Sequence, residues 1–183
     1  MATEVEIKAW VDDPAGMRAR VAARYPQAGS YTKEDVYFRL PGAAGGAQSG
    51  GPIEFRLRLD DGEAIVTAKR KRVVEGIEVN DEMEYRVSDG PSFERFAEYL
   101  GATVFSRKRK VGERFAAGEA TIELSHVDRL GDFIEIEWLL EAPSPEEVAT
   151  ARAGVRSLLE GLGIGQEKVE PRYYTDLLAS LGA

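Results

Sequence analysis

The sequence predicts an α+β fold in which eight strands form an up-and-down antiparallel sheet that can close into a β-barrel, with helices on its outside. Three observations predict this fold. Eight short segments alternate between apolar and polar residues, which is the period of a strand with one buried face. Turn residues separate several of these segments, as in an up-and-down sheet. Four other segments carry the start or stop signals of helices.

The strands follow one another along most of the chain, and one hairpin is specified directly. Asp60-Asp61-Gly62 has the residues of a tight turn between the third and fourth strands. The predicted strands are residues 4–11, 33–40, 53–59, 64–71, 81–87, 103–111, 120–127 and 133–140.

The helices are predicted from their ends. Asp13 and Pro14 begin the first, and Gly101 ends the second. The run from Ser144 to Glu147 is a capping box that begins the third. We expect helices at residues 14–24, 91–100, 145–161 and 173–181, all as external supports without catalytic residues.

Length and composition restrict the class of protein. The 183 residues are 43% hydrophobic and 31% charged, values typical of one globular domain, which we expect to span residues 1–183. No apolar run approaches the roughly 18 to 20 residues that cross a bilayer. The absence of cysteine excludes disulfides and thiol nucleophiles. An acidic N-terminus is unlike a secretory signal, so we expect a cytoplasmic protein with no membrane partner.

The charge distribution argues against a nucleic-acid partner. The net charge is −8, whereas such proteins need a broad basic surface. Two basic runs, residues 69–72 and 107–110, oppose this trend. Side chains on a strand alternate between its faces, so each run divides between interior and surface. We therefore expect half of this positive charge to be enclosed.

Residues 41–52 form a Gly/Ala-rich segment without an apolar pattern. Its composition predicts a long loop between two strands. It is either a passive connector or a lid over a site.

The strands share an unusual feature, because their polar faces are almost entirely ionic. Like charges recur two residues apart, at roughly 6.5 to 7 Å, where they repel unless an opposite charge lies between them. Mg²⁺ or Mn²⁺ suits pairs of carboxylates, and a polyphosphate suits pairs of Arg and Lys. The ionic faces include Glu4, Glu6 and Lys8; Glu54, Arg56 and Arg58; Glu82, Glu84 and Arg86; and Glu135 and Glu137.

These charges occur in an order that resembles a known family, the CYTH superfamily of triphosphate tunnel enzymes, nearest its class IV adenylyl cyclase-like branch. Glu4-Val-Glu6-Ile-Lys8 looks like the ExExK signature of that family, and the resemblance covers essentially the whole chain. The further matching motifs are Asp35-Val-Tyr37-Phe38, Arg56-Leu-Arg58, Thr67-Ala-Lys69, Glu82-Met-Glu84, Arg107-Lys-Arg109, the block from Leu130 to Glu137, and Tyr173-Tyr-Thr-Asp-Leu-Leu178.

The resemblance implies a role for each matching residue inside an eight-stranded tunnel. Lys8 and Glu6 would be catalytic, with Lys8 beside the reacting phosphorus or orienting the attacking group. The expected metal ligands for Mg²⁺ or Mn²⁺ are Glu4, Glu6, Glu135 and Glu137. The expected phosphate-binding residues are Arg56, Arg58, Lys69, Arg107 and Arg109. A second metal, or support for the basic side chains, would involve Glu82, Glu84 and Glu123.

One position departs from the family pattern. Ser125 stands where the family often has an acid, and Glu123, on the same face, is the residue that could replace it. His126 points to the other face and is expected to be structural.

The predicted function is divalent-metal-dependent cleavage of a small triphosphate, with hydrolysis favoured because we identify no residues that read an adenine. The alternatives are a class IV adenylyl cyclase, a non-catalytic polyphosphate-binding module and a structural β-domain. Outer apolar residues such as Phe55 and Leu57 would be covered by helices or by a second copy in a homodimer.

Overall fold

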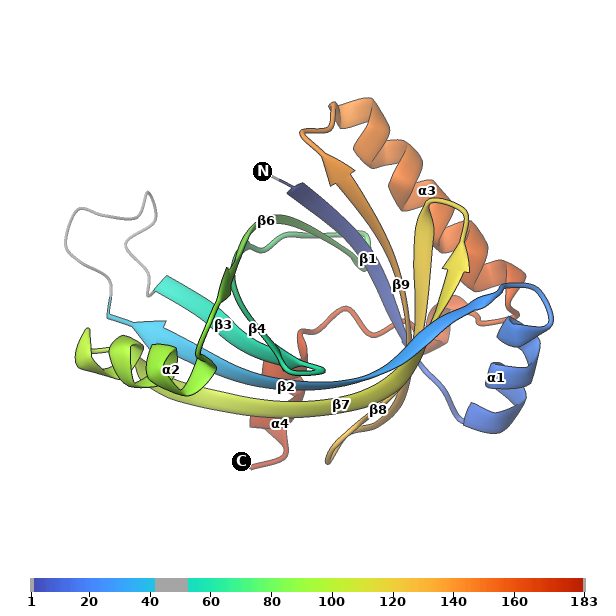
Figure 1. Ribbon diagram of the computed structural model, residues 1–183. Coiled ribbons are helices and arrows are strands. Elements are labelled where there is room, and N and C mark those ends of the chain that lie inside the picture. Colours follow the sequence, from blue (N-terminus) through green and yellow to red (C-terminus); the bar gives the residue numbers. More distant parts are fainter. Residues whose placement is uncertain (1, 42–52, 183) are drawn as a thin grey trace.

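The computed structural model describes residues 2–41 and 53–182. Within these residues, eight antiparallel strands close into a barrel in the order β1-β9-β8-β7-β2-β3-β4-β6 (Figure 1), and pairing between β1 and β6 completes the ring. A short extra strand, β5, pairs with β6. The predicted barrel is confirmed. The strands are β1 (Ala2–Trp10), β2 (Gln27–Leu40), β3 (Ile53–Asp60), β4 (Glu63–Arg70), β5 (Val73–Val74), β6 (Ile77–Val87), β7 (Thr103–Ala117), β8 (Ala120–Val127) and β9 (Gly131–Glu141).

Several strands are longer than their apolar patterns predicted. β2 begins at Gln27 and β7 continues to Ala117, although residues 27–32 do not alternate. These two ends pair with each other, with a register shift next to Gly29. β6 begins at Ile77 because it pairs with both β1 and β5 there. Strand partners, which local sequence does not reveal, set these boundaries.

The two helices with predicted N-caps, those at residues 14 and 145, begin at these caps. Asp13 accepts a hydrogen bond from the backbone of Gly16, and Ser144 and Glu147 form the capping box. The predicted loop lies almost wholly in residues 42–52, outside the described residues. The helices are α1 (Pro14–Ala22), α2 (Gly90–Tyr99), α3 (Pro145–Gly161) and α4 (Tyr174–Ser180), with a 3₁₀ turn, η1 (Gln166–Lys168).

The hydrophobic core lies outside the barrel wall, between the strands and the helices. α3 runs along β1 and β9 (Figure 1), where Val155 and Leu159 pack against Ile7 and Ile136. α2 covers β2 and β3 through a second cluster that includes Leu57. Because apolar side chains point outward to these helices, the inner face of every strand is free to carry charge.

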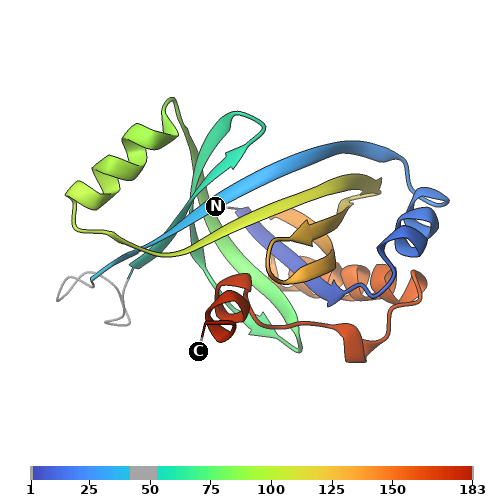
Figure 2. The same cartoon turned by 90° about the horizontal axis from the view of Figure 1, so that it is seen from below.

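α4 occupies one end of the barrel and builds a third, smaller cluster. The chain returns from α3 past β1 and ends in α4 (Figure 2). Leu177 packs there with Val127 and Phe133, which come from β8 and β9. None of the helices in the described ranges is long and apolar enough to span a membrane.

Candidate functional site

The barrel interior is divided into an acidic half and a basic half. Four neighbouring strands, β6, β1, β9 and β8, point mainly carboxylates inward, and the other four point mainly Lys and Arg inward. The acidic half contributes Glu4, Glu6, Glu78, Glu82, Glu84, Glu123, Glu135 and Glu137, with Lys8 among them. The basic half contributes Lys33, Arg56, Arg58, Lys69, Lys108, Lys110 and Arg114, with Asp35 and Asp60 among them.

Two cavities occupy this interior. One extends toward α4, and the other opens at the opposite end of the barrel between Asp60, Glu84 and Arg114. The side chains that line both cavities lie midway along the barrel. They are Glu4, Lys33, Arg56, Arg58, Glu123 and Glu137.

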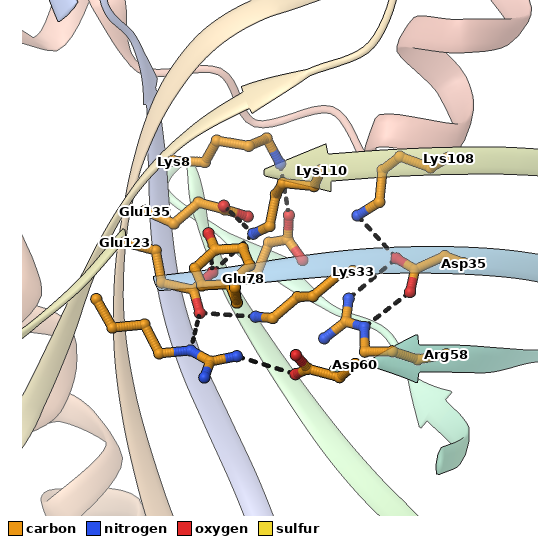
Figure 3. A network of polar contacts seen from close by, with 12 residues as sticks. Lys8, Lys33, Asp35, Arg58, Asp60, Glu78, Lys108, Lys110, Glu123 and Glu135 are labelled. Carbon is orange, nitrogen blue, oxygen red and sulfur yellow. Dashed lines mark hydrogen bonds and ion pairs between the residues drawn. The ribbon is translucent and has the colours of Figure 1, made fainter. Parts of the chain in front are cut away.

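At the two seams between the halves, acid and base neutralise each other. On the β8–β7 side, Glu123 contacts Lys33 at 2.6 Å and Lys110 at 2.8 Å (Figure 3). On the β4–β6 side, the Lys69 ammonium contacts Glu82 and lies 2.5 Å from Glu4. Burial alone would raise the pKa of Glu4, but the charge of Lys69 lowers this pKa to about 2.

The centre of the acidic half carries an uncompensated pair of carboxyl groups. Glu6 of β1 lies directly opposite Glu137 of β9, and across the described ranges neither is within salt-bridge distance of a cation. Burial, together with Glu135 and Glu78, raises the pKa of Glu6 well above its ordinary value. Burial and the nearby Glu4 raise the pKa of Glu137 to about 7.

This pair suits a divalent cation. Two enclosed carboxylates without a positive partner repel each other until a proton or a cation joins them. Mg²⁺ is commonly held by one or two carboxylates together with phosphate oxygens rather than by a complete protein cage. No cluster of three or more potential metal ligands occurs within residues 2–41 and 53–182. Glu6 and Glu137 therefore fit the predicted metal.

The centre of the basic half carries an arginine with unused bonding capacity. In the described part of the chain, the buried Nε of Arg56 has no hydrogen-bond partner. The closest carboxylate to this side chain is that of Glu84, which lies 3.7 Å from the Nη2 of Arg56. Arg58 differs, because Asp35 accepts from its Nε at 2.7 Å and from its Nη2 at 3.0 Å. Lys108 also contacts Asp35, at 3.1 Å. The guanidinium of Arg56 is thus available to a phosphate.

The first turn of α4 closes one end of the cavity. Tyr173, Tyr174 and Thr175 line it, so the prediction that all helices are external supports is wrong for α4. The ring of Tyr174 lies between two ammonium groups, 4.6 Å from Lys8 and 4.5 Å from Lys108. Each lysine also has an acidic partner; that of Lys8 is Glu78, 3.0 Å away.

Most predicted site residues line the interior, but two do not. The side chains of Arg107 and Arg109 are 60% and 48% exposed and pair with outer acids such as Glu94. Lys108 and Lys110 point inward instead, so the predicted orientation of this run is wrong. The inward residues from the predicted set are Glu4, Glu6, Lys8, Arg56, Arg58, Lys69, Glu82, Glu123, Glu135 and Glu137, with Glu84 at the open end.

The register of β7 explains the error. Lys108 and Lys110 lie directly opposite Asp35 and Lys33 of β2, and opposed residues share a face of the sheet. A run of four bases contains no apolar residue that could indicate which face is outward. The apolar residues after the run, Val111 and the fully buried Phe115, have the odd-numbered parity of the outer face and indicate the observed orientation.

The remaining predictions concern β8, and several further interior residues were not predicted. His126 points outward and lies 2.9 Å from Asp132, as expected for a structural residue. Ser125 points inward, and its buried Oγ has no partner within the described ranges. Sequence reasoning did not assign Lys33, Glu78 or Tyr174 to the site.

A closed β-barrel with opposed acidic and basic inner walls forms a tunnel whose charges suit an anion together with a cation. A model of the CYTH domain matches residues 2–174, so the chain belongs to the CYTH domain family. Membership confirms the predicted class, a triphosphate-processing tunnel enzyme, and implies dependence on a divalent metal.

Solved structures agree with this assignment. PH1819 from Pyrococcus horikoshii OT3 is 25% identical with a TM-score of 0.81, over 97% of this chain and 99% of that one. PH1012 from the same organism is 26% identical with a TM-score of 0.77, over 95% and 98%. HpAC1 from Hippeastrum, described with a dominant triphosphatase activity, shares the fold at 16% identity and a TM-score of 0.65, over 98% and 96%. No curated protein sequence matches significantly.

Proposed function

We propose that this protein is a triphosphatase that uses Mg²⁺ or Mn²⁺ to hydrolyse a small triphosphate inside the barrel. The observation that carries the proposal is the position of two centres with unused binding capacity. In the described residues, Glu6 and Glu137 have no cation at salt-bridge distance, and the Nε of Arg56 has no hydrogen-bond partner. Glu137 belongs to β9 and Arg56 to β3, and these strands are four apart in a ring of eight. A metal-binding wall and a phosphate-binding wall therefore lie on opposite sides of one enclosed space.

The interior residues divide the work of binding. Glu6 and Glu137 would hold the cation, whereas Glu4 and Glu135 are already paired with lysines. A bound divalent cation would neutralise phosphate oxygens and lower the pKa of a bound water. The residues that would bind the phosphates are Arg56, Arg58, Lys69, Lys108 and Lys110.

Hydrolysis would require positioning and charge neutralisation more than covalent chemistry. The oxygen of water forms a bond to the terminal phosphorus, and the bridging P–O bond breaks to release orthophosphate and a diphosphate. Lys8, held by Glu78 at 3.0 Å, supplies a fixed positive charge for the phosphoryl oxygens as their charge redistributes. Arg56 would do the same from the opposite wall.

Adenylyl cyclase activity is the first alternative, since both reactions use these walls. Cyclisation also requires a nucleoside held in one orientation, so that its 3′-hydroxyl attacks the α-phosphorus. The midway residues shared by both cavities are all charged, which favours phosphate binding over base recognition. The second alternative is a polyphosphate-binding module without turnover, which the substitution of Ser125 for an acid would suit.

One experiment separates these functions. The purified protein is incubated with Mg²⁺ or Mn²⁺ and tripolyphosphate, thiamine triphosphate or ATP, and the products are resolved. We expect orthophosphate release that stops on addition of EDTA. Cyclic AMP with pyrophosphate as the main products from ATP would establish the cyclase instead. Tight binding of tripolyphosphate without turnover under either metal would establish the binding module.

A further inference from the structure

Glu123 has no free acceptor position. Its Oε1 accepts hydrogen bonds from Lys33 at 2.6 Å and Arg114 at 3.2 Å, and its Oε2 accepts from Tyr31 and Lys110, both at 2.8 Å (Figure 3). A carboxylate offers about four lone-pair directions. Because protein donors use all four, Glu123 is unsuited to bind a metal, although it is 4% exposed and faces the interior.

The hydrogen bond from Tyr31 to Glu123 requires a glycine on the neighbouring strand. Gly112 of β7 lies beside the Tyr31 hydroxyl, and a Cβ at this position would be 2.7 Å from that oxygen. The same Cβ would be 2.4 Å from the carbonyl oxygen of Leu124. The absence of a side chain at Gly112 thus allows the phenol to reach Glu123. Three cations also surround the ring, with Lys33 at 4.4 Å from its centre.

The three cations depend on Glu123 to different degrees. Arg114 also contacts Asp60, at 2.9 Å, and Lys110 also contacts Glu135. Lys33 contacts no other carboxylate in the described residues. Lys33 lines both cavities, so its ammonium lies midway along the barrel, where a triphosphate would pass.

We propose that Lys33 is a phosphate-binding residue and that Glu123 is a positioning residue which holds it toward the substrate. The inference rests on the proposed function and adds a residue absent from the predicted site. Burial and the nearby Lys110 lower the pKa of Lys33 to about 8, so an incoming phosphate would stabilise the charged form of this side chain. Tyr31 and Gly112 fix the orientation of Glu123.

The test is a double-mutant cycle of Lys33→Ala and Glu123→Gln. For each variant we measure the KM for tripolyphosphate, the calorimetric Kd for tripolyphosphate and the Kd for Mn²⁺ alone. We expect each single variant to raise KM and the tripolyphosphate Kd about tenfold. The double variant should resemble Lys33→Ala alone, because Glu123 acts through that lysine. The Mn²⁺ Kd should stay unchanged. The matched control is Glu113→Gln, which removes an outer glutamate paired with Arg18 and should change none of these constants.

Two results would overturn the inference. A weaker Mn²⁺ affinity in Glu123→Gln would make Glu123 a metal ligand, and fully additive effects would separate it from Lys33. If Glu123→Gln does not fold, Tyr31→Phe replaces it in the cycle, because it removes one contact and keeps the ring. If the wild-type protein shows no turnover, only the proposed function is refuted. The calorimetric Kd for tripolyphosphate still tests whether Lys33 binds phosphate.

Discussion

The two faces of the barrel wall carry opposite chemistry, and each has a separate task. On the outer face, residues such as Ile136 and Leu57 are almost completely buried against helices, which is where apolar burial stabilises the fold. On the inner face, charges are matched at the seams, whereas within the described residues Glu6 and Glu137 have no cation at salt-bridge distance and the Nε of Arg56 has no hydrogen-bond partner. The matched pairs hold side chains in place, and the unmatched groups are those with capacity for a ligand. Substitutions on the two faces should therefore affect different measurements.

The largest effect is expected from the unmatched carboxyl pair. Glu6→Gln combined with Glu137→Gln should lower metal-dependent kcat at least about 1000-fold, because the cation loses both proposed ligands. Stability should not fall, since burial and neighbouring glutamates raise the pKa of both carboxyl groups, so their charged forms are unfavourable in the folded protein. Steady-state kinetics with Mg²⁺ and urea denaturation check the two parts. Normal activity in a folded double variant would refute the assignment of the metal wall.

The four basic residues of β7, residues 107–110, give the next largest effect and a matched control. Lys108→Ala or Lys110→Ala should raise KM by about 10- to 100-fold, as expected for the loss of charge-assisted hydrogen bonds to phosphate. Arg107→Ala and Arg109→Ala should leave KM unchanged, because both side chains are on the outer face. If the Arg variants raise KM as much as the Lys variants, the inward orientation of a side chain on β7 does not decide phosphate binding.

This strand also shows how much of the site the sequence can predict. Alternation identified the ionic faces correctly where an apolar residue marked the other face, as Ile7 does beside Glu6 and Leu57 beside Arg56. Residues 107–110 lack such a marker, and the orientation came from pairing with β2. Lys33 was missed for a related reason.

The position of Lys33 depends on partners that are distant in the sequence. Glu123 is 90 residues away, and the contact forms only when β8, β7 and β2 come together. The eight barrel strands, the hairpin at residues 60–62 and the caps of α1 and α3 have local sequence signals, so they were predicted well. Ion pairs form only when the barrel closes. The sequence therefore predicted which residues carry charge on the inner face, but not which of them pair.

On the outer face, two glycines of one helix should have opposite effects on stability. A Cβ at Gly154 of α3 would be 2.5 Å from Cζ3 of Trp138, so Gly154→Ala should destabilise the protein by about 1–3 kcal/mol through overpacking. A Cβ at Gly161 meets no atom within 4 Å, so Gly161→Ala should stabilise it by about 0.5 kcal/mol. Urea denaturation measures both. kcat per folded molecule should be unchanged, and a loss of kcat in Gly154→Ala would show that the two faces are coupled.

The last effect concerns the segment that leads into α4. Glu170 precedes α4, and its carboxylate accepts hydrogen bonds from Trp10 at 3.2 Å and from Arg172 at 2.6 Å. These bonds, first those from Arg172, lower the pKa of Glu170 from 4.5 to about 2. A lowered pKa adds stability above pH 4.5, and this contribution is lost as the pH falls toward 2. Glu170→Gln should therefore be less stable at pH 7 by about 1 kcal/mol, a modest amount because Arg172 is more than half exposed. Urea denaturation of both proteins between pH 7 and pH 2.5 should show this difference shrinking below pH 4.5. A difference independent of pH would mean that the charge of Glu170 contributes nothing to holding α4 at the end of the barrel.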